Sequence, residues 1–158
     1  MNGEGAALRI VPSDAAKRAR VAIQTYRLDM NVQLIAPKGF ETTGGWTRGT
    51  LVLNHPANDI QGSIALDRGN CVEVAFFAPN GTPNPLGSCT NIFFVNPLDT
   101  GLYARLRVTG SSASSSDKAF SVDKDRAVLE NAGSGTLTFT GPFTGAGTFA
   151  FDGVGNSV

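Results

Sequence analysis

The chain has 158 residues, of which 13 are basic and 13 acidic, so its net charge is zero with the one histidine neutral. This length suits one domain, and the balanced charge excludes a general electrostatic attraction to nucleic acid. Charged residues make up only 16% of the chain, against about 25% in an average soluble domain, and there are 19 glycines. We therefore expect residues 1–158 to form a single β-rich domain with many turns. No apolar run is long enough to span a membrane, and the sequence leaves the localisation open.

The only helical pattern lies near the N-terminus, in SDAAKRAR at residues 13–20. Ser13 is a favourable N-cap, Asp14 favours the first turn of a helix, and the alanine, lysine and arginine residues that follow are helix formers. We therefore expect residues 1–20 to form an N-terminal arm that contains one short helix.

The strands are expected from residue 21 onward. Residues 21–36 mostly alternate apolar and polar side chains, with one change of phase between Ile23 and Tyr26, which predicts one long, bent strand. Residues 47–66 predict a hairpin around the turn PAND. Further strands are expected at 71–78, 91–96 and 102–108, with weaker ones at 120–122 and 126–131.

One seven-residue pattern occurs twice near the C-terminus, as GTLTFTG at 135–141 and GTFAFDG at 147–153. Each copy predicts a strand bracketed by glycines, and the pair predicts a terminal hairpin. Two copies are too few for a solenoid. The eight to ten short strands of the whole chain predict an all-β fold, an antiparallel β-sandwich or barrel.

The C-terminal segment is almost free of charge, because Asp152 is the one charged residue between 132 and 158. Natural edge strands usually carry charges that prevent pairing with another chain. Their absence predicts that the outer face of the terminal hairpin contacts another molecule, with a second copy of the chain as the first choice. The residues expected on this face are Thr136, Thr138, Thr140 and Thr148.

Few residues offer catalytic or metal-binding chemistry. The one histidine, His55, lies at a turn, and no phosphate-binding or nucleophile motif is present. Cys71 and Cys89 are expected to be free, because pairing of residues 71–78 with 89–96 as a hairpin would separate them by about 20 Å, beyond the reach of a disulfide. We expect no enzymatic activity, no cofactor and no metal.

These features predict a non-catalytic structural subunit, of the virion, tail or filament type, that self-associates through its uncharged C-terminal hairpin. The alternative is a ligand-binding module, for example for carbohydrate, that uses the loops 79–90 and 110–118. In that case the rings of Trp46 and Tyr103 would stack on the ligand. The expected partners are therefore other copies of the chain, or a glycan or small ligand.

Overall fold

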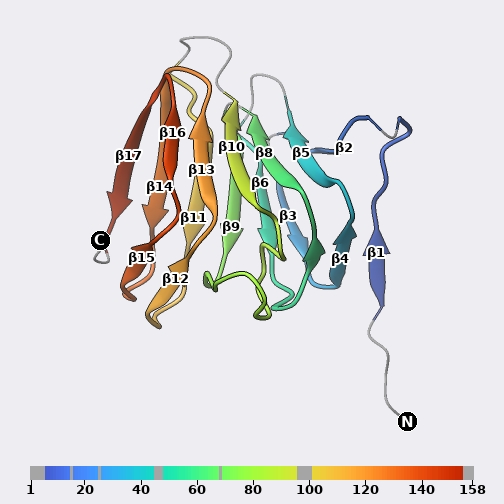
Figure 1. The fold of residues 1–158 in the computed structure, drawn as a ribbon, viewed down its shortest axis with the longest axis horizontal. Helices are drawn as coiled ribbons and strands as arrows, with labels where there is room; N and C mark the ends of the chain where they lie inside the picture. Colours follow the sequence, from blue (N-terminus) through green and yellow to red (C-terminus); the bar gives the residue numbers. More distant parts are fainter. Residues whose placement is uncertain are drawn as a thin grey trace.

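The fold is a parallel β-solenoid (Figure 1). The computed structural model describes residues 6–14, 16–24, 26–44, 48–67, 69–95 and 101–154. In these residues the chain forms 17 β-strands and no helix. Every strand pairing is parallel, so the expected antiparallel sandwich or barrel is wrong, although the expected all-β class is confirmed.

Two six-stranded sheets run the length of the solenoid, one behind the other in Figure 1, and each turn of the chain adds one strand to each. Sheet 1 contains β2 (Ala19–Ala22), β5 (Gly39–Thr43), β8 (Ser63–Asp67), β10 (Asn91–Val95), β13 (Ala119–Val122) and β16 (Phe143–Gly145). Sheet 2 contains β3 (Arg27–Met30), β6 (Thr50–Leu53), β9 (Cys71–Val74), β11 (Arg105–Val108), β14 (Arg126–Asn131) and β17 (Thr148–Gly153).

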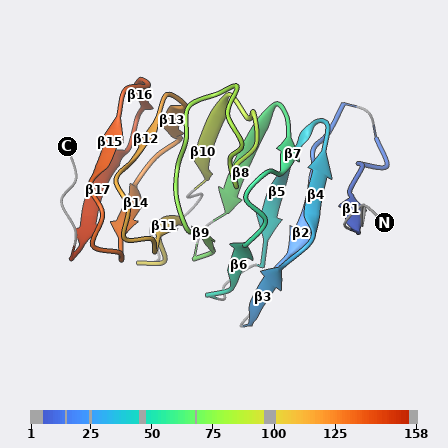
Figure 2. The ribbon, with the colours of Figure 1, turned by 90° about the horizontal axis from the view of Figure 1, so that it is seen from below.

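A third side of the solenoid carries two shorter sheets. One contains β1 (Ala7–Arg9), β4 (Gln33–Ala36) and β7 (Asp59–Ile60), and the other contains β12 (Ser114–Ser116) and β15 (Leu137–Phe139). The loop of residues 75–90 lies between these two sheets (Figure 2). It takes the place of a strand on this side in the third turn.

The core consists of columns of apolar side chains, because the parallel register aligns equivalent positions of successive turns. One column in sheet 1 contains Ala19, Phe40, Ile64, Ile92, Phe120 and Phe143. One column in sheet 2 contains Leu28, Leu51, Val72, Leu106, Leu129 and Phe151. The inner members of both columns are buried, whereas Leu28, Phe143 and Phe151 at the ends are 41%, 37% and 53% exposed. The core is therefore continuous along the axis and open at its ends.

In the first turn, two expected elements are not formed: the long bent strand of residues 21–36 and the short N-terminal helix. Residues 21–36 form parts of β2, β3 and β4 and not one bent strand, and the change of phase between Ile23 and Tyr26 marks a corner. The expected short helix is also wrong. The Asp14 carboxylate accepts a hydrogen bond from the Ala16 amide at 2.9 Å, which closes a local turn, and Arg20 already belongs to β2.

The expected hairpins are wrong for the same reason in each case. Residues 47–66 contain β6, β7 and β8, which belong to three different sheets. The two copies of the seven-residue pattern form β15 and β17, which lie on different sides of the solenoid. Each strand pairs with the strand one turn away, and consecutive strands do not pair with each other.

Candidate interaction surfaces

The outer face of sheet 2 carries one connected set of ion pairs. The register aligns Asp29, Val52, Glu73, Arg107, Glu130 and Asp152 in one column on successive strands. Arg107 lies between two acids, with Nη1 3.3 Å from Glu73 Oε2 and Nε 2.9 Å from Glu130 Oε2. Arg105 contacts the same Glu130 oxygen, and its Nη1 lies 3.8 Å from Asp152 Oδ2.

This set links successive turns electrostatically. Burial by itself would raise the pKa of Glu130, but the hydrogen bonds from Arg105 and Arg107 outweigh burial and hold that pKa below its ordinary value. Burial would likewise lower the pKa of Arg107, yet the hydrogen bond to Glu130 and the other charges around it raise that pKa. Both groups are therefore firmly ionised at neutral pH.

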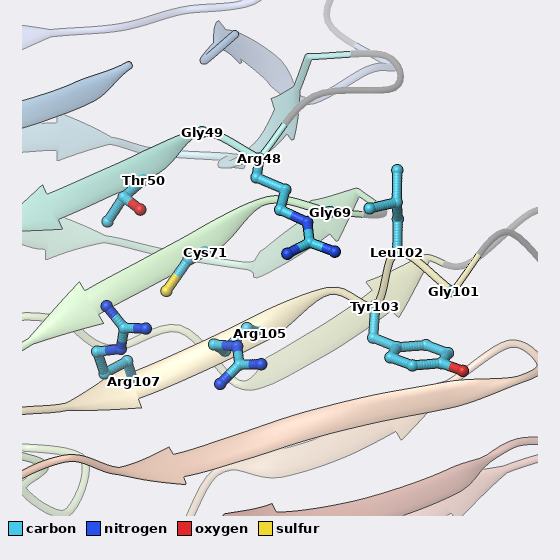
Figure 3. Close-up of a pocket in the computed structure, with 10 residues that line it drawn as sticks. All are labelled: Arg48, Gly49, Thr50, Gly69, Cys71, Gly101, Leu102, Tyr103, Arg105 and Arg107. Atoms are coloured by element: carbon cyan, nitrogen blue, oxygen red, sulfur yellow. The ribbon is translucent and has the colours of Figure 1, made fainter. Parts of the chain in front are cut away.

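A groove opens beside these ion pairs, where three successive strands of sheet 2 begin (Figure 3). We call it the arginine groove. It encloses about 260 Å³ and is lined by Arg48, Gly49, Thr50, Gly69, Cys71, Gly101, Leu102, Tyr103, Arg105 and Arg107. The Arg48 guanidinium reaches over the start of β9 toward β11 (Figure 3). The groove thus gathers three guanidinium groups from two different turns.

The two ends of the solenoid form the second kind of surface. We define the N-terminal end by β1, β2 and β3, and the C-terminal end by β16 and β17. Among the described residues these strands pair with another strand on one side only, so their other edges present backbone N–H and C=O groups that no strand pairs. At the C-terminal end a cluster of aromatic rings surrounds Phe143, whose centroid lies 5.1 Å from Phe120 and 4.9 Å from Phe149. This end is apolar and only partly covered.

The threonines expected to form one face are split between two sides of the solenoid. All four are exposed, but Thr136, Thr138 and Thr140 lie in or beside β15, whereas Thr148 begins β17 in sheet 2. Of the two rings expected to stack on a ligand, Tyr103 lines the arginine groove and lies 5.5 Å from the Arg126 guanidinium, and Trp46 lies outside the described residues. Sequence reasoning did not select the three arginines of the groove.

The two segments proposed as ligand-binding loops are held to the solenoid, and Ser114–Ser116 of the second forms β12. Lys118, which is 1% exposed, donates hydrogen bonds from Nζ to Asn80 Oδ1 at 2.7 Å, to the Gly87 carbonyl at 2.9 Å and to the Cys89 carbonyl at 3.0 Å. Burial lowers the pKa of this lysine. The Asn58 side chain donates to the Pro85 carbonyl at 2.8 Å, so residues 80–89 are fastened to the solenoid.

Both cysteines are free and buried, which confirms the expectation. The expected hairpin of residues 71–78 with 89–96 does not form, because β9 and β10 belong to different sheets. Burial raises the pKa of each thiol to about 12.

His55 accepts a hydrogen bond from the Ala57 amide at Nδ1, at 3.2 Å, as suits a residue at a turn.

In the described part of the chain, no three histidine, cysteine or acidic side chains gather to form a metal site. The same residues contain no helix of the length and apolarity needed to cross a membrane.

Comparisons with models of protein families, with curated proteins and with solved structures give no match.

Proposed function

We propose that this protein is a non-catalytic structural subunit whose solenoid stacks end to end on other copies of the chain. The observation that carries this proposal is the position of the exposed apolar side chains. In the described residues, the large apolar side chains that are exposed lie in β1, the first turn or the last turn: Leu8, Val11, Tyr26, Leu28, Phe143, Phe151 and Val154. Exposed apolar patches of this kind are typical of interfaces.

The incomplete turns at the two ends complement each other. The sixth turn contributes β16 and β17, and the described residues add no strand to it on the third side. At the other end, β1 lies alone on the third side, ahead of the first complete turn. In a head-to-tail stack, β1 of the next copy would complete the sixth turn, while β2 and β3 of that copy would pair with β16 and β17. All of these pairings would be parallel, like those inside the chain.

Apolar side chains at the two ends are also complementary. Continuing the register across the contact places the small Ala19 of the next copy beside Phe143, and Leu28 beside Phe151. The apolar columns of sheet 1 and sheet 2 would then continue from one copy into the next. Because the two ends lie at opposite extremes of the long axis (Figure 1), one copy could contact two neighbours. Contacts of this heterologous kind generate filaments when they do not close into a ring.

The contact would bring together charges of both signs, because Asp29 of the next copy would align with Asp152 and Arg27 would lie beside both acids. Asp152 is the one charged residue of β16 and β17, and its side chain is 65% exposed. Arg27 of the next copy would align with Ala150, two residues from Asp152. Arg105 aligns with Val128 and forms an ion pair with Glu130, two residues further on. Arg27 and Asp152 would therefore be offset by two residues across the contact, as Arg105 and Glu130 are within the chain.

The test compares one charge placed at an end with the same charge placed on a side. Phe151→Lys puts an ammonium group on the C-terminal end, whereas Ser88→Lys puts it on an exposed position of the loop 75–90, in the middle of the solenoid. We expect light scattering to show long oligomers for wild type and Ser88→Lys, and monomers for Phe151→Lys with an unchanged circular dichroism spectrum. A wild-type protein that stays monomeric at all concentrations would overturn the proposal.

A mixing experiment identifies which ends meet. Phe151→Lys blocks the C-terminal end and leaves the N-terminal end free, and Leu28→Lys does the reverse. Head-to-tail stacking predicts that each variant alone is a monomer of 16.5 kDa and that the mixture contains one-to-one dimers. Dimers formed by either variant alone would instead show contact between like ends, which contradicts the proposed register.

A further inference from the structure

The arginine groove holds hydrogen-bond donors that the protein does not use. Arg48 is exposed and has no hydrogen-bond or ion-pair partner among the described residues. Arg105 directs Nη1 to its acids, and Arg107 directs Nε and Nη1, so that both Nη2 groups and Nε of Arg105 have no partner in the same part of the chain. Each guanidinium has five N–H donors in a planar fork that suits a carboxylate or phosphate group.

The side chains that line the groove carry positive charge. The described residues that line it contribute three guanidinium groups and no carboxylate. Glu73 and Glu130 balance Arg107 and Arg105 from outside this lining, and Arg48 adds a charge that no acid among the described residues balances. An anion in the groove would therefore be attracted by Arg48, and no carboxylate among the described lining residues would oppose it.

The remaining lining limits the size and shape of a ligand. The volume of about 260 Å³ is slightly below the range of roughly 300–1,000 Å³ that is usual for small-molecule sites. Gly49, Gly69 and Gly101 let a ligand approach the backbone closely, and the Tyr103 ring supplies an aromatic wall. These features suit a ligand of about one ring.

We propose that the arginine groove binds the oxyanion group of a small ligand, with Arg48 as the principal contact and Tyr103 beside the ligand body. A carboxylated sugar ring and a free phosphate share this oxyanion chemistry. The groove lies on the outer face of sheet 2, at the start of β6, β9 and β11, and not at either end. Binding there is therefore independent of the stacking of copies.

The test uses calorimetric titration of the full chain at low ionic strength with three probes: glucuronate, glucose and inorganic phosphate. Glucuronate and glucose differ only at the carboxylate, so we expect glucuronate to bind at least tenfold more tightly than glucose. Phosphate binding at a similar affinity would show that the oxyanion alone is recognised. Weak or absent phosphate binding would show that the ring is also required. Equal affinity for glucose and glucuronate, or no binding of glucuronate and phosphate, would overturn the proposal.

Two variants locate the site. Arg48→Gln removes the unpaired guanidinium, and Lys38→Gln removes an exposed cation between β4 and β5, at a different corner of the solenoid. Both positions are exposed, so both variants should fold as the wild type does. We expect Arg48→Gln to weaken binding about tenfold and Lys38→Gln to leave it unchanged. Equal losses in the two variants would show general charge attraction and contradict a site in the groove.

Discussion

Arg27 in the first turn of the solenoid reaches across the second turn to Glu73 in the third, with 3.0 Å between Nη2 and Oε1. This contact is possible because β6, which lies between their strands, presents Thr50 and Val52 at the two intervening positions. Neither side chain is charged, and both are short enough to leave the path open. Glu73 meets Arg107 on its other side, so one buried carboxylate connects charges from three different strands.

The first prediction is that Glu73→Gln lowers the free energy of unfolding by about 2 kcal/mol, because charge-assisted hydrogen bonds to a largely buried group are worth more than exposed ion pairs. Urea unfolding measures the change. Asp14→Asn is the matched control, since Asp14 and Lys17 form an exposed pair at 3.6 Å and the amide keeps the oxygen that caps Ala16. The control should change stability by less than about 0.5 kcal/mol. Similar losses in both variants would contradict the role assigned to Glu73.

The second prediction concerns the close approach of β5 to β8. Gly39 has a φ of +72°, and a Cβ added there would lie 1.9 Å from the Ser63 carbonyl oxygen. Gly81 has a φ of +86° with no atom near its Cβ position. Alanine at either site costs about 1 kcal/mol for the left-handed backbone, but Gly39→Ala must also displace a neighbouring strand. We expect a loss above about 3 kcal/mol for Gly39→Ala in urea unfolding, and a much smaller one for Gly81→Ala. Equal losses in the two variants would show that the left-handed backbone alone, and not the contact with Ser63, determines the cost of the alanine.

The positions of many strands could be predicted from the sequence, but their partners could not. Cys71–Val74, Asn91–Val95 and Arg105–Val108 all lie within expected strands. Alternation reports that one face of a strand is buried, and it carries no information on the direction of the neighbouring strand. The equivalent residues Phe40, Ile64, Ile92 and Phe120 follow one another at intervals of 24, 28 and 28 residues. Loops of different length at the corners therefore hide the repeat.

The same limit applies to the arginine groove. Tyr103 was selected because aromatic rings bind sugars, and it does line the groove. Arg105 and Arg107 flank Leu106, which is the ordinary outward and inward alternation of a strand and indicates nothing more. Arg48 comes close to them only because β6 and β11 both pair with β9. Knowledge of the pairing would have been needed to find the cluster.

The third prediction concerns the anchor of the loop 75–90. Lys118→Met keeps the apolar stem of the side chain but leaves three oxygen acceptors in the loop without their donor. We expect a loss of about 3 kcal/mol and faster hydrogen exchange of the amides of residues 80–89. Lys124→Met is the control, because Lys124 is exposed. Unchanged exchange in the loop of Lys118→Met would show that other contacts hold the loop.

The last prediction is a loss of stability in alkali that comes from Cys71. Burial raises the pKa of its thiol from 9.0 to about 12, so above pH 9 the unfolded chain loses this proton while the folded chain keeps it. The contribution of this thiol to stability is therefore complete below pH 9 and falls as the pH rises toward 12, by on the order of 1 kcal/mol at pH 10. Cys89, whose thiol pKa burial also raises to about 12, adds a loss in the same direction. Lys118 acts in the opposite direction, since its lowered pKa makes deprotonation favour the folded state. Cys71→Ser isolates the thiol: the difference in unfolding free energy between wild type and variant should shrink between pH 8 and pH 10. A difference that is constant over this range would show that the thiol titrates alike in both states.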